Sequence, residues 1–178
     1  MRIISGLRRG MKLSSLDGLD TRPTTDRVKE NVFNIISFSL PGGNVLDLFA
    51  GSGALGIEAI SRGSSHCTFV ESNKNAIKII KQNIEAASFS DKCDILVYDA
   101  VSYLKSCNNT FDLIFLDPPY NKGFLKPVLD IIYERNLLSD DGIIVVETER
   151  GGESIDGVKF DIRKNVAYGK TAITILQR

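Results

Sequence analysis

The chain has 178 residues, of which 43% are hydrophobic and 25% are charged, and its 22 basic residues balance its 22 acidic residues. This length and composition indicate one globular domain and exclude a disordered, collagen-like or coiled-coil chain. Because the net charge is zero, bulk electrostatics cannot draw the protein onto nucleic acid or an anionic membrane. Any such attraction must come from a local cluster of charge.

The cysteines and the histidine argue against a metal centre. Cys67, Cys93 and Cys107 are far apart with no CxxC pair, and His66 is the only histidine, so no zinc or iron–sulfur ligand set can be assembled. The first residues lack the apolar core of a secretory signal, and every apolar run is well below the roughly 18 residues that a membrane helix needs. We therefore expect a cytoplasmic protein that uses neither a metal nor a membrane.

Positive charge gathers at the start of the chain. Residues 1–12 hold four basic side chains and no acidic one, and Gly6 and Gly10 would let this stretch turn as a small hairpin. Taken alone, the cluster fits a solvated terminus as well as it fits a binding surface. We expect a basic extension over residues 1–24 and one globular domain over residues 25–178.

From Thr25 onward, helix-like and strand-like patterns alternate. The first helix starts at Thr25 or Asp26 and is stopped by residues 41–43, and apolar spacing predicts further helices over residues 54–61, 74–87, 101–105 and 124–135. Apolar runs predict strands over residues 45–49, 67–70, 94–98, 111–116 and 142–147, the last opened by a turn at residues 140–142. Two final runs, 158–163 and 171–176, are too close for a crossover helix and should pair as an antiparallel hairpin.

This alternation predicts an α/β fold, with a doubly wound, mostly parallel sheet of seven strands that ends in an antiparallel hairpin. In such a sheet, ligands bind at the carboxyl ends of the strands. The residues at those ends therefore decide the function.

A glycine-rich loop follows the first predicted strand. Residues 51–56, GSGALG, match the G-x-G-x-x-G pattern just before a helix, where backbone N–H groups and the helix dipole favour a nucleotide. Glu71, twenty residues after Gly51, ends the next strand and could hold ribose hydroxyls. These features alone fit NAD equally well.

Asp47 distinguishes a site for NAD from a site for S-adenosylmethionine. Its carboxylate lies where a pyrophosphate would sit and would repel phosphate charge, whereas it would attract the ammonium group of S-adenosylmethionine. Together with Glu71 for the ribose and Asp99 for the adenine amino group, it forms an acidic set at successive strand ends. Because three acids occur at successive strand ends, a site for S-adenosylmethionine is favoured over a purely structural role in which each acid caps a strand end.

Residues 117–120, DPPY, close the fourth predicted strand. Two prolines make a stiff turn that can aim the Asp117 carboxylate and the Pro118 carbonyl at one point, with Tyr120 as a stacking surface. An exocyclic amino group on a base offers two N–H donors and a π face, and accepting both bonds would free its lone pair for attack on a sulfonium methyl. The turn therefore predicts methyl transfer to a base.

Four stretches resemble known signatures. Residues 47–56, DLFAGSGALG, resemble the first motif of class I S-adenosylmethionine-dependent methyltransferases, and DPPY resembles the motif of those that act on amino nitrogens. Residues 22–30, RPTTDRVKE, and 168–171, YGKT, resemble the terminal signatures of the RsmD family, in the same order and spacing over essentially the whole chain. The resemblance implies a Rossmann-like methyltransferase that makes N2-methylguanine at the position called G966 in bacterial 16S rRNA.

The resemblance also implies roles for individual residues, although Lys29 and Lys170 stand where the family has Arg and Asp. The target guanine is received by Asp117, Pro118, Pro119 and Tyr120. The cofactor is held by Thr25, Asp47, Phe49, Ala50, Gly51, Ser52, Gly53, Glu71, Asp99 and Ala100. Contacts to RNA come from Arg2, Arg8, Arg9, Lys12, Arg22 and Arg27, with the amino-terminal hairpin beside the crevice.

On this interpretation, the cofactor S-adenosyl-L-methionine becomes S-adenosyl-L-homocysteine. The partner is 16S rRNA, within the small ribosomal subunit or an assembly intermediate, and the chain acts as a monomer. Three alternatives stay open: an adenine-N6 methyltransferase on DNA or RNA, an NAD-linked oxidoreductase, which Asp47 opposes, and a non-catalytic RNA-binding module, which Asp117 and Tyr120 oppose. The DPPY turn alone does not say which base enters.

Overall fold

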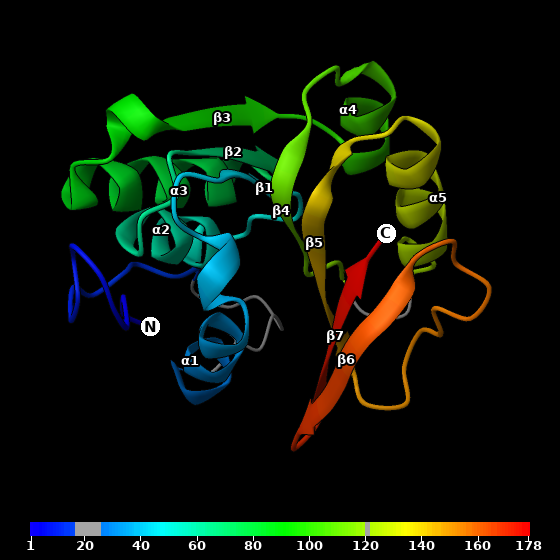
Figure 1. Ribbon diagram of the computed structural model, residues 1–178. Coiled ribbons are helices and arrows are strands. Elements are labelled where there is room, and N and C mark those ends of the chain that lie inside the picture. The colour runs from blue at the N-terminus through cyan, green and yellow to red at the C-terminus, as the bar shows by residue number, and fades with distance from the viewer. Residues whose placement is uncertain (17–25, 120–121) are drawn as a thin grey trace.

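A computed structural model of the chain describes residues 1–16, 26–119 and 122–178, and these residues form one mixed sheet with helices on both faces (Figure 1). The helices are α1 (Asp26–Ile35), α2 (Ala54–Ser61), α3 (Lys74–Ala87), α4 (Ala100–Ser106) and α5 (Leu125–Glu134), with two short 3₁₀ helices, η1 (Ser37–Ser39) and η2 (Ser90–Lys92). The strands are β1 (Asn44–Asp47), β2 (His66–Glu71), β3 (Cys93–Val97), β4 (Phe111–Leu116), β5 (Leu138–Glu149), β6 (Asp161–Tyr168) and β7 (Thr171–Gln177).

The strand order is β3-β2-β1-β4-β5-β7-β6. The neighbours from β3 to β5 pair in parallel, and β7 pairs antiparallel with both β5 and β6. This order confirms the predicted doubly wound, mostly parallel sheet with a terminal antiparallel hairpin. Because the order reverses between β1 and β4, the carboxyl ends of these two strands flank the crevice in which such folds bind ligands.

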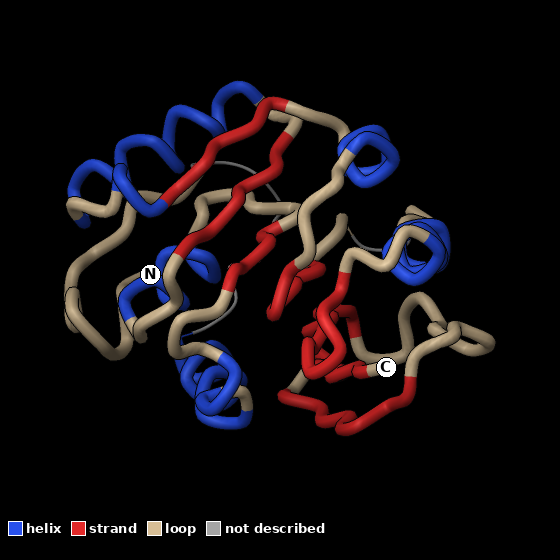
Figure 2. Tube along the Cα trace, turned by 45° about the horizontal axis from the view of Figure 1, so that its top comes forward, coloured by secondary structure: helices blue, strands red, loops and turns tan. Residues whose placement is uncertain are grey.

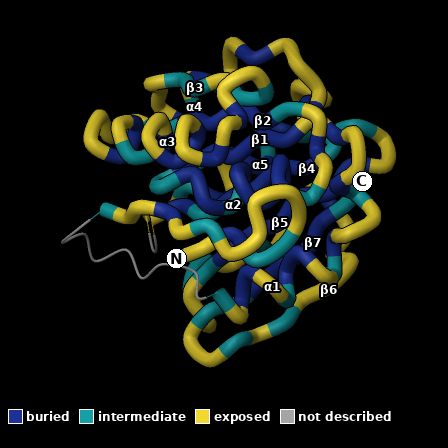
Figure 3. The backbone as a smooth tube through the Cα atoms, turned by 90° about the vertical axis from the view of Figure 1, so that its left-hand side faces the viewer, coloured by how far each residue is buried: buried dark blue, intermediate teal, exposed yellow. Residues whose placement is uncertain are grey.

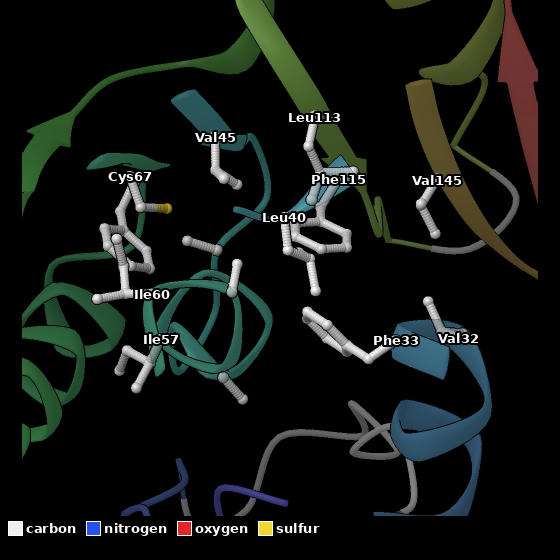
Figure 4. Packing of buried hydrophobic residues seen from close by; sticks show 14 of the residues in the cluster. Val32, Phe33, Leu40, Val45, Ile57, Ile60, Cys67, Leu113, Phe115 and Val145 are labelled. Atoms are coloured by element: carbon white, nitrogen blue, oxygen red, sulfur yellow. The ribbon is translucent and has the colours of Figure 1, made fainter. Parts of the chain in front are cut away.

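Alternate residues of each central strand point to opposite faces and enter two separate cores. On one face, Val45 and Leu113 pack with α1, α2 and α3, and on the other, Leu46 and Ile114 pack with α4 and α5. Figure 2 shows helices on both faces of the sheet. Figure 4 shows the first core, in which Phe33 of α1 reaches Phe115 of β4 with ring centroids 5.5 Å apart. The central strands are thus buried on both faces, while the exposed residues lie in parts of the turns and on the outer sides of the helices (Figure 3).

Local sequence explains where the helices begin and end. Asn73 caps α3, because its side-chain oxygen accepts N–H bonds from Asn75 and Ala76. Pro127 lies in the first turn of α5, where its missing N–H costs nothing. Over the described ranges, no helix is both long enough and apolar enough to cross a membrane.

Among the parallel strands, the largest differences from the predicted boundaries are at β1 and β5. β1 ends at Asp47 rather than at residue 49, so Asp47 is the last residue of the strand and not two residues before its end. β5 begins at Leu138, and the predicted turn at residues 140–142 is an irregularity within the strand, between the pairs Phe111↔Leu138 and Leu113↔Ile143. Gly142 allows this, since a Cβ there would lie 2.8 Å from the Leu138 Cδ1 atom.

The first strand of the terminal hairpin is also shifted. It was expected over residues 158–163 but spans Asp161–Tyr168. A two-residue turn at Gly169, with φ +62°, and Lys170 pairs Tyr168 with Thr171 and fixes the register. Phe160 is instead buried, with its ring centroid 5.5 Å from that of Tyr133.

The amino-terminal residues form the expected small hairpin. Arg2 and Lys12 pair as an antiparallel bridge, and the Ile3 N–H donates to the Met11 carbonyl at 2.9 Å. Ile3 and Leu13 are buried in the core shared by α1, α2 and α3. The hairpin is therefore packed against the globular domain; a boundary after residue 24 stays a prediction, because residues 17–25 lie outside the described ranges.

Candidate active site

The acidic residues singled out from the sequence lie at the carboxyl ends of four neighbouring parallel strands. Asp47 ends β1, Glu71 ends β2, Asp99 follows β3 and Asp117 follows β4. Since these strands are adjacent in the order β3-β2-β1-β4, the four carboxylates share one edge of the sheet. The predicted acidic set is thus brought together by the fold.

The glycine loop runs between β1 and α2. Gly51 and Gly53 have φ of +54° and +77°, backbone conformations that side-chain-bearing residues rarely adopt. The Ser52 carbonyl accepts a bond of 2.9 Å from the Asn83 side chain, and Gly53 donates to the Ala50 carbonyl at 2.7 Å. The loop is held in shape by the protein itself before any ligand is considered.

Gly56, the third glycine of the pattern, has a different role. A Cβ at this position would lie 2.4 Å from the Phe69 ring and 2.6 Å from the Cys67 sulfur. The residue therefore lets α2 pack closely against β2 and does not contribute space for a ligand.

Asp47 is buried beneath the loop, with 2% of its surface exposed. Its Oδ2 accepts the Gly56 N–H at 3.0 Å, which ties the strand end to α2. Burial raises the pKa of Asp47 to about 7, the Gly56 bond opposes this shift, and the Glu71 charge adds to it. A nearby ligand cation would favour the ionised form.

Glu71 and Asp99 are fixed by backbone N–H groups. The two oxygens of Glu71 accept from Gly51 at 2.9 Å and from Asn73 at 2.8 Å, so this carboxylate joins the glycine loop to the start of α3. Asp99 is exposed and caps α4 by accepting the Ser102 N–H at 2.9 Å, with Ala100 buried behind it. Both carboxylates retain lone pairs that can accept further bonds.

The turn after β4 begins with Asp117, which is partly buried, followed by a buried Pro118 and an exposed Pro119. Burial raises the pKa of Asp117 well above its usual range, and the charges of Glu147 and Asp47 raise it further. Tyr120, the predicted stacking residue, lies outside the described residues. Phe49 of the loop contacts Phe124 at the start of α5, with ring centroids 5.8 Å apart.

Glu147 of β5 belongs to this site but was not singled out from the sequence. It is 5% exposed and lines a small pocket with Pro118 and Pro119. The register pairs Leu116 with Val146, which places Asp117 and Glu147 at neighbouring positions of adjacent strands. The signal that could have found it is an acid at the end of an otherwise apolar strand run.

The predicted RNA-binding residues differ in their contacts and in their exposure. Arg2 pairs with Asp26 at 3.1 Å, Arg8 donates to the Ala87 carbonyl at 2.7 Å, and Arg9, Lys12 and Arg27 are exposed. Arg22 and Thr25 lie outside the described ranges.

The tip of the hairpin does not lie beside the crevice. Leu7 bonds to Ser61 at the end of α2, and Arg8 bonds to Ala87 at the end of α3, whereas both helices begin at the carboxyl edge of the sheet. The tip therefore lies toward the edge opposite Asp117, and the expectation that the whole hairpin flanks the crevice is wrong (Figure 1). Contact of Arg8 and Arg9 with RNA stays a prediction.

A buried ionic cluster holds the hairpin in place. Glu58 of α2 is fully buried and pairs with Lys29 at 3.1 Å and Arg62 at 2.7 Å, and it also accepts the N–H groups of Ile4 and Ser5. Lys29, one of the two departures from the family signatures, is itself fully buried. A lone acid within the apolar stretch ALGIEAIS was the available signal for this cluster.

The sheet order, the glycine loop and the acidic strand ends together define a Rossmann-like methyltransferase fold. Solved structures agree. The yhhF protein from Escherichia coli has a TM-score of 0.89 at 32% identity and covers 100% of this chain and 97% of that chain. A conserved hypothetical protein from Streptococcus pyogenes has a TM-score of 0.79 at 36% identity and covers 85% of this chain and 96% of that chain.

Sequence comparison identifies the family. The model of the family described as conserved hypothetical protein 95 matches residues 1–177. YlbH from Bacillus subtilis is 41% identical over 182 residues (100% of this chain, 99% of the relative), and ribosomal RNA small subunit methyltransferase D from Haemophilus influenzae is 34% identical over 180 residues (99% and 93%). The chain belongs to this family, and the resemblance to the RsmD family is confirmed.

Proposed function

We propose that the chain transfers a methyl group from S-adenosylmethionine to the exocyclic N2 amino group of a guanine in 16S rRNA, at a site of the G966 type. The observation that carries the proposal is the Asp117-Pro118 turn, which lies one strand away from the glycine loop at the carboxyl edge of the sheet. The relatives named as small-subunit rRNA methyltransferases support the substrate class.

The chemistry of the site fits the cofactor. Burial raises the pKa of Asp47 to about 7, and the negative charge of Glu71 adds to this shift. A cationic ligand would relieve this unfavourable burial, whereas a pyrophosphate would worsen it. S-adenosylmethionine supplies an ammonium group and an electrophilic methyl group on a sulfonium when bound.

Three strand ends divide the recognition of the cofactor. Asp47 and the Gly51–Gly53 loop would hold the methionine part, Glu71 the ribose hydroxyls, and Asp99 with the Ala100 N–H the adenine. Phe49, Ala50, Ser52 and Thr25 would complete the pocket. Each carboxylate accepts N–H or O–H donors, which S-adenosylmethionine offers at its ammonium, ribose and adenine ends.

At the turn, the Asp117 carboxylate and the Pro118 carbonyl would accept the two N–H bonds of the guanine amino group. This would weaken delocalisation of its lone pair into the ring and orient it for in-line attack. Pro119 would keep the turn rigid, and Tyr120 would stack on the base. Arg2, Arg9, Lys12, Arg22 and Arg27 would contact phosphates, with Arg8 more constrained by its bond to Ala87.

An adenine-N6 methyltransferase is the second candidate, because the same turn accepts either amino group. The test is to incubate the protein with methyl-labelled S-adenosylmethionine and small ribosomal subunits that lack the modification, and then to identify the labelled nucleoside. We expect N2-methylguanosine. Label in N6-methyladenosine would keep the cofactor and the turn but overturn the base, and no label on naked rRNA, on subunits or on their assembly intermediates would overturn the function.

A further inference from the structure

The stretch of chain that begins with the Asp117-Pro118 turn leads to the start of α5. Asp117 directly follows β4, so the sheet fixes this end of the stretch. At the other end, Phe124 precedes α5 and packs on Phe49 of the glycine loop, with ring centroids 5.8 Å apart. The start of α5 is therefore in contact with the loop that would hold the cofactor.

A second contact at the start of α5 comes from a distant part of the chain. Glu153, in the loop between β5 and β6, accepts the Leu125 N–H at 3.0 Å through its Oε1 atom. The first N–H groups of a helix have no partner within the helix, and the Phe124 side chain, at the capping position, carries no acceptor. Leu125 is 1% exposed, so solvent has little access to this end of the helix. Glu153 thus supplies the acceptor that the local sequence lacks.

The loop that carries Glu153 is itself anchored on both sides of this residue. Before it, the Arg150 N–H donates to the Lys170 carbonyl at 2.7 Å, which ties the loop to the turn of the terminal hairpin. After it, Ile155 and Val158 pack against the core on the side of α4 and α5. A carboxylate held in this way can fix the position of the helix end that it binds.

Glu153 also lies near the proposed catalytic turn. Together with Leu125, it lines the same small pocket as Pro118 and Pro119. A shift at the start of α5 would therefore be transmitted to the turn that receives the target base. Misplacement of reacting groups by about 1 Å can lower a rate by about 10²-fold, even when its cause lies away from the chemistry.

We propose that Glu153 is a positioning residue for methyl transfer: by accepting the Leu125 N–H, it holds the start of α5, and with it the base-receiving turn, in register with the cofactor loop. This inference rests on the proposed function for its catalytic meaning, whereas the bond to Leu125 is a property of the protein without substrate. Glu153 takes no part in the bond changes. The lone pair of the amino nitrogen forms the N–C bond, the methyl–sulfur bond breaks with its electrons left on sulfur, and the extra proton on nitrogen is released to water.

The first test does not require activity. Hydrogen exchange followed by NMR should show the Leu125 N–H exchanging at least about tenfold faster in Glu153→Ala than in the wild type, with exchange in the central strands unchanged. Glu153→Gln keeps a side-chain carbonyl oxygen and should protect the Leu125 N–H as the wild type does. Leu125 exchange at the same rate in all three proteins would overturn the proposal.

The second test separates the transfer rate from cofactor affinity. With saturating rRNA and cofactor, Glu153→Ala should lower the single-turnover rate by about 10- to 10²-fold, while its affinity for S-adenosylmethionine stays within about twofold of the wild type. Glu153→Gln should restore the rate, because it replaces the acceptor without the charge. Asp156→Ala removes an exposed acid from the same loop and is the matched control, with the wild-type rate expected.

Three results would contradict the positioning role: a wild-type rate in Glu153→Ala, a Glu153→Gln variant as slow as Glu153→Ala, or an equal loss of rate and cofactor affinity. If Glu153→Ala fails to fold, Glu153→Asp takes its place, since it keeps the charge but shortens the reach by one methylene, and it should be slow. If the wild type methylates no rRNA, the proposed function fails, and hydrogen exchange alone decides whether Glu153 holds the start of α5.

Discussion

Within the described part of the chain, Glu58 and the partly buried Asp117 lie in different charge environments. Glu58 is enclosed by Lys29, Arg62 and two backbone N–H groups, so its charge is fully matched. Burial raises the pKa of Asp117, and the negative charges of Glu147 and Asp47 raise it further. The first arrangement holds three segments of the chain together, whereas the second leaves acceptors that a cationic cofactor and an amine can use. Buried charge serves structure where the protein itself supplies the counter-ion and function where a ligand supplies it.

The largest expected effect comes from removing Lys29, one of the two cations that pair with Glu58 in the buried ionic cluster. Lys29→Met should lower the free energy of unfolding by about 3–5 kcal/mol, because Glu58 stays buried with part of its charge unpaired. Urea unfolding measures this, and the double variant Lys29→Met with Glu58→Gln should recover much of the loss. A loss below about 1 kcal/mol would mean that Arg62 alone neutralises Glu58.

The next largest effect concerns Asp117, the proposed acceptor for the amino group. Asp117→Ala should lower the rate of methyl transfer by about 10²–10³-fold, since it removes a preorganised acceptor, while cofactor affinity stays within a fewfold of the wild type. The assay is single-turnover transfer with saturating cofactor. Asp91→Ala, an exposed acid in η2, should have no effect, and an active, folded Asp117→Ala would remove the turn from the mechanism.

A smaller effect concerns the pH dependence of cofactor binding. The pKa of Asp47 is raised to about 7 in the free protein, and a cationic ligand favours the ionised form. Affinity should therefore rise by up to about tenfold per pH unit as the pH increases toward 7, and level off above it. Calorimetric titration should detect proton release below pH 7, and Asp47→Asn should abolish both the pH dependence and the release. Wild-type affinity that does not change with pH would separate Asp47 from the ligand cation.

The smallest expected effect concerns Arg9 and Lys12, two cations of the amino-terminal hairpin that lie outside the buried ionic cluster. Arg9 and Lys12 are exposed on the hairpin, so replacing either with serine should weaken RNA binding uniformly across sequences. The slope of log affinity against log salt should become shallower by about one unit for each lost phosphate contact. Arg163→Ser, whose guanidinium lies 4.5 Å from the centre of the Phe38 ring, is the control. An unchanged slope for both hairpin variants would remove the hairpin from the interface.

Much of the fold followed from periodicity, and the failures have local causes. Alternating apolar patterns placed the helices and the five parallel strands, because both faces of the sheet are buried. The first helix is shorter than predicted: α1 ends at Ile35, before the stop expected at residues 41–43, and η1 follows it. Periodicity does not predict the hydrogen bond of 2.8 Å from the Ser139 hydroxyl to Asp112, which accompanies the earlier start of β5 at Leu138. It also does not predict that Phe160 is buried against Tyr133, so that β6 begins only at Asp161.

The site was predictable as a set of strand ends but not as an electrostatic arrangement. Asp47, Glu71, Asp99 and Asp117 were found because motif spacing places them after strands. The surroundings of Glu147 and Lys29 were not predicted, since Glu147 lies beside Asp117 and Lys29 pairs with Glu58, residues 30 and 29 positions away along the chain. Sequence spacing carries no information on such long-range pairs without the fold.

The outer strand β6 has features that disfavour the addition of a further strand to this edge of the sheet. Its residues are exposed or partly exposed, and its pairing with β7 shifts register between Ile162 and Lys164. Asp161, Arg163 and Lys164 place charges of both signs along this edge. A strand from another molecule would have to match an irregular register and bury these charges, so the open edge resists the strand addition that leads to aggregation.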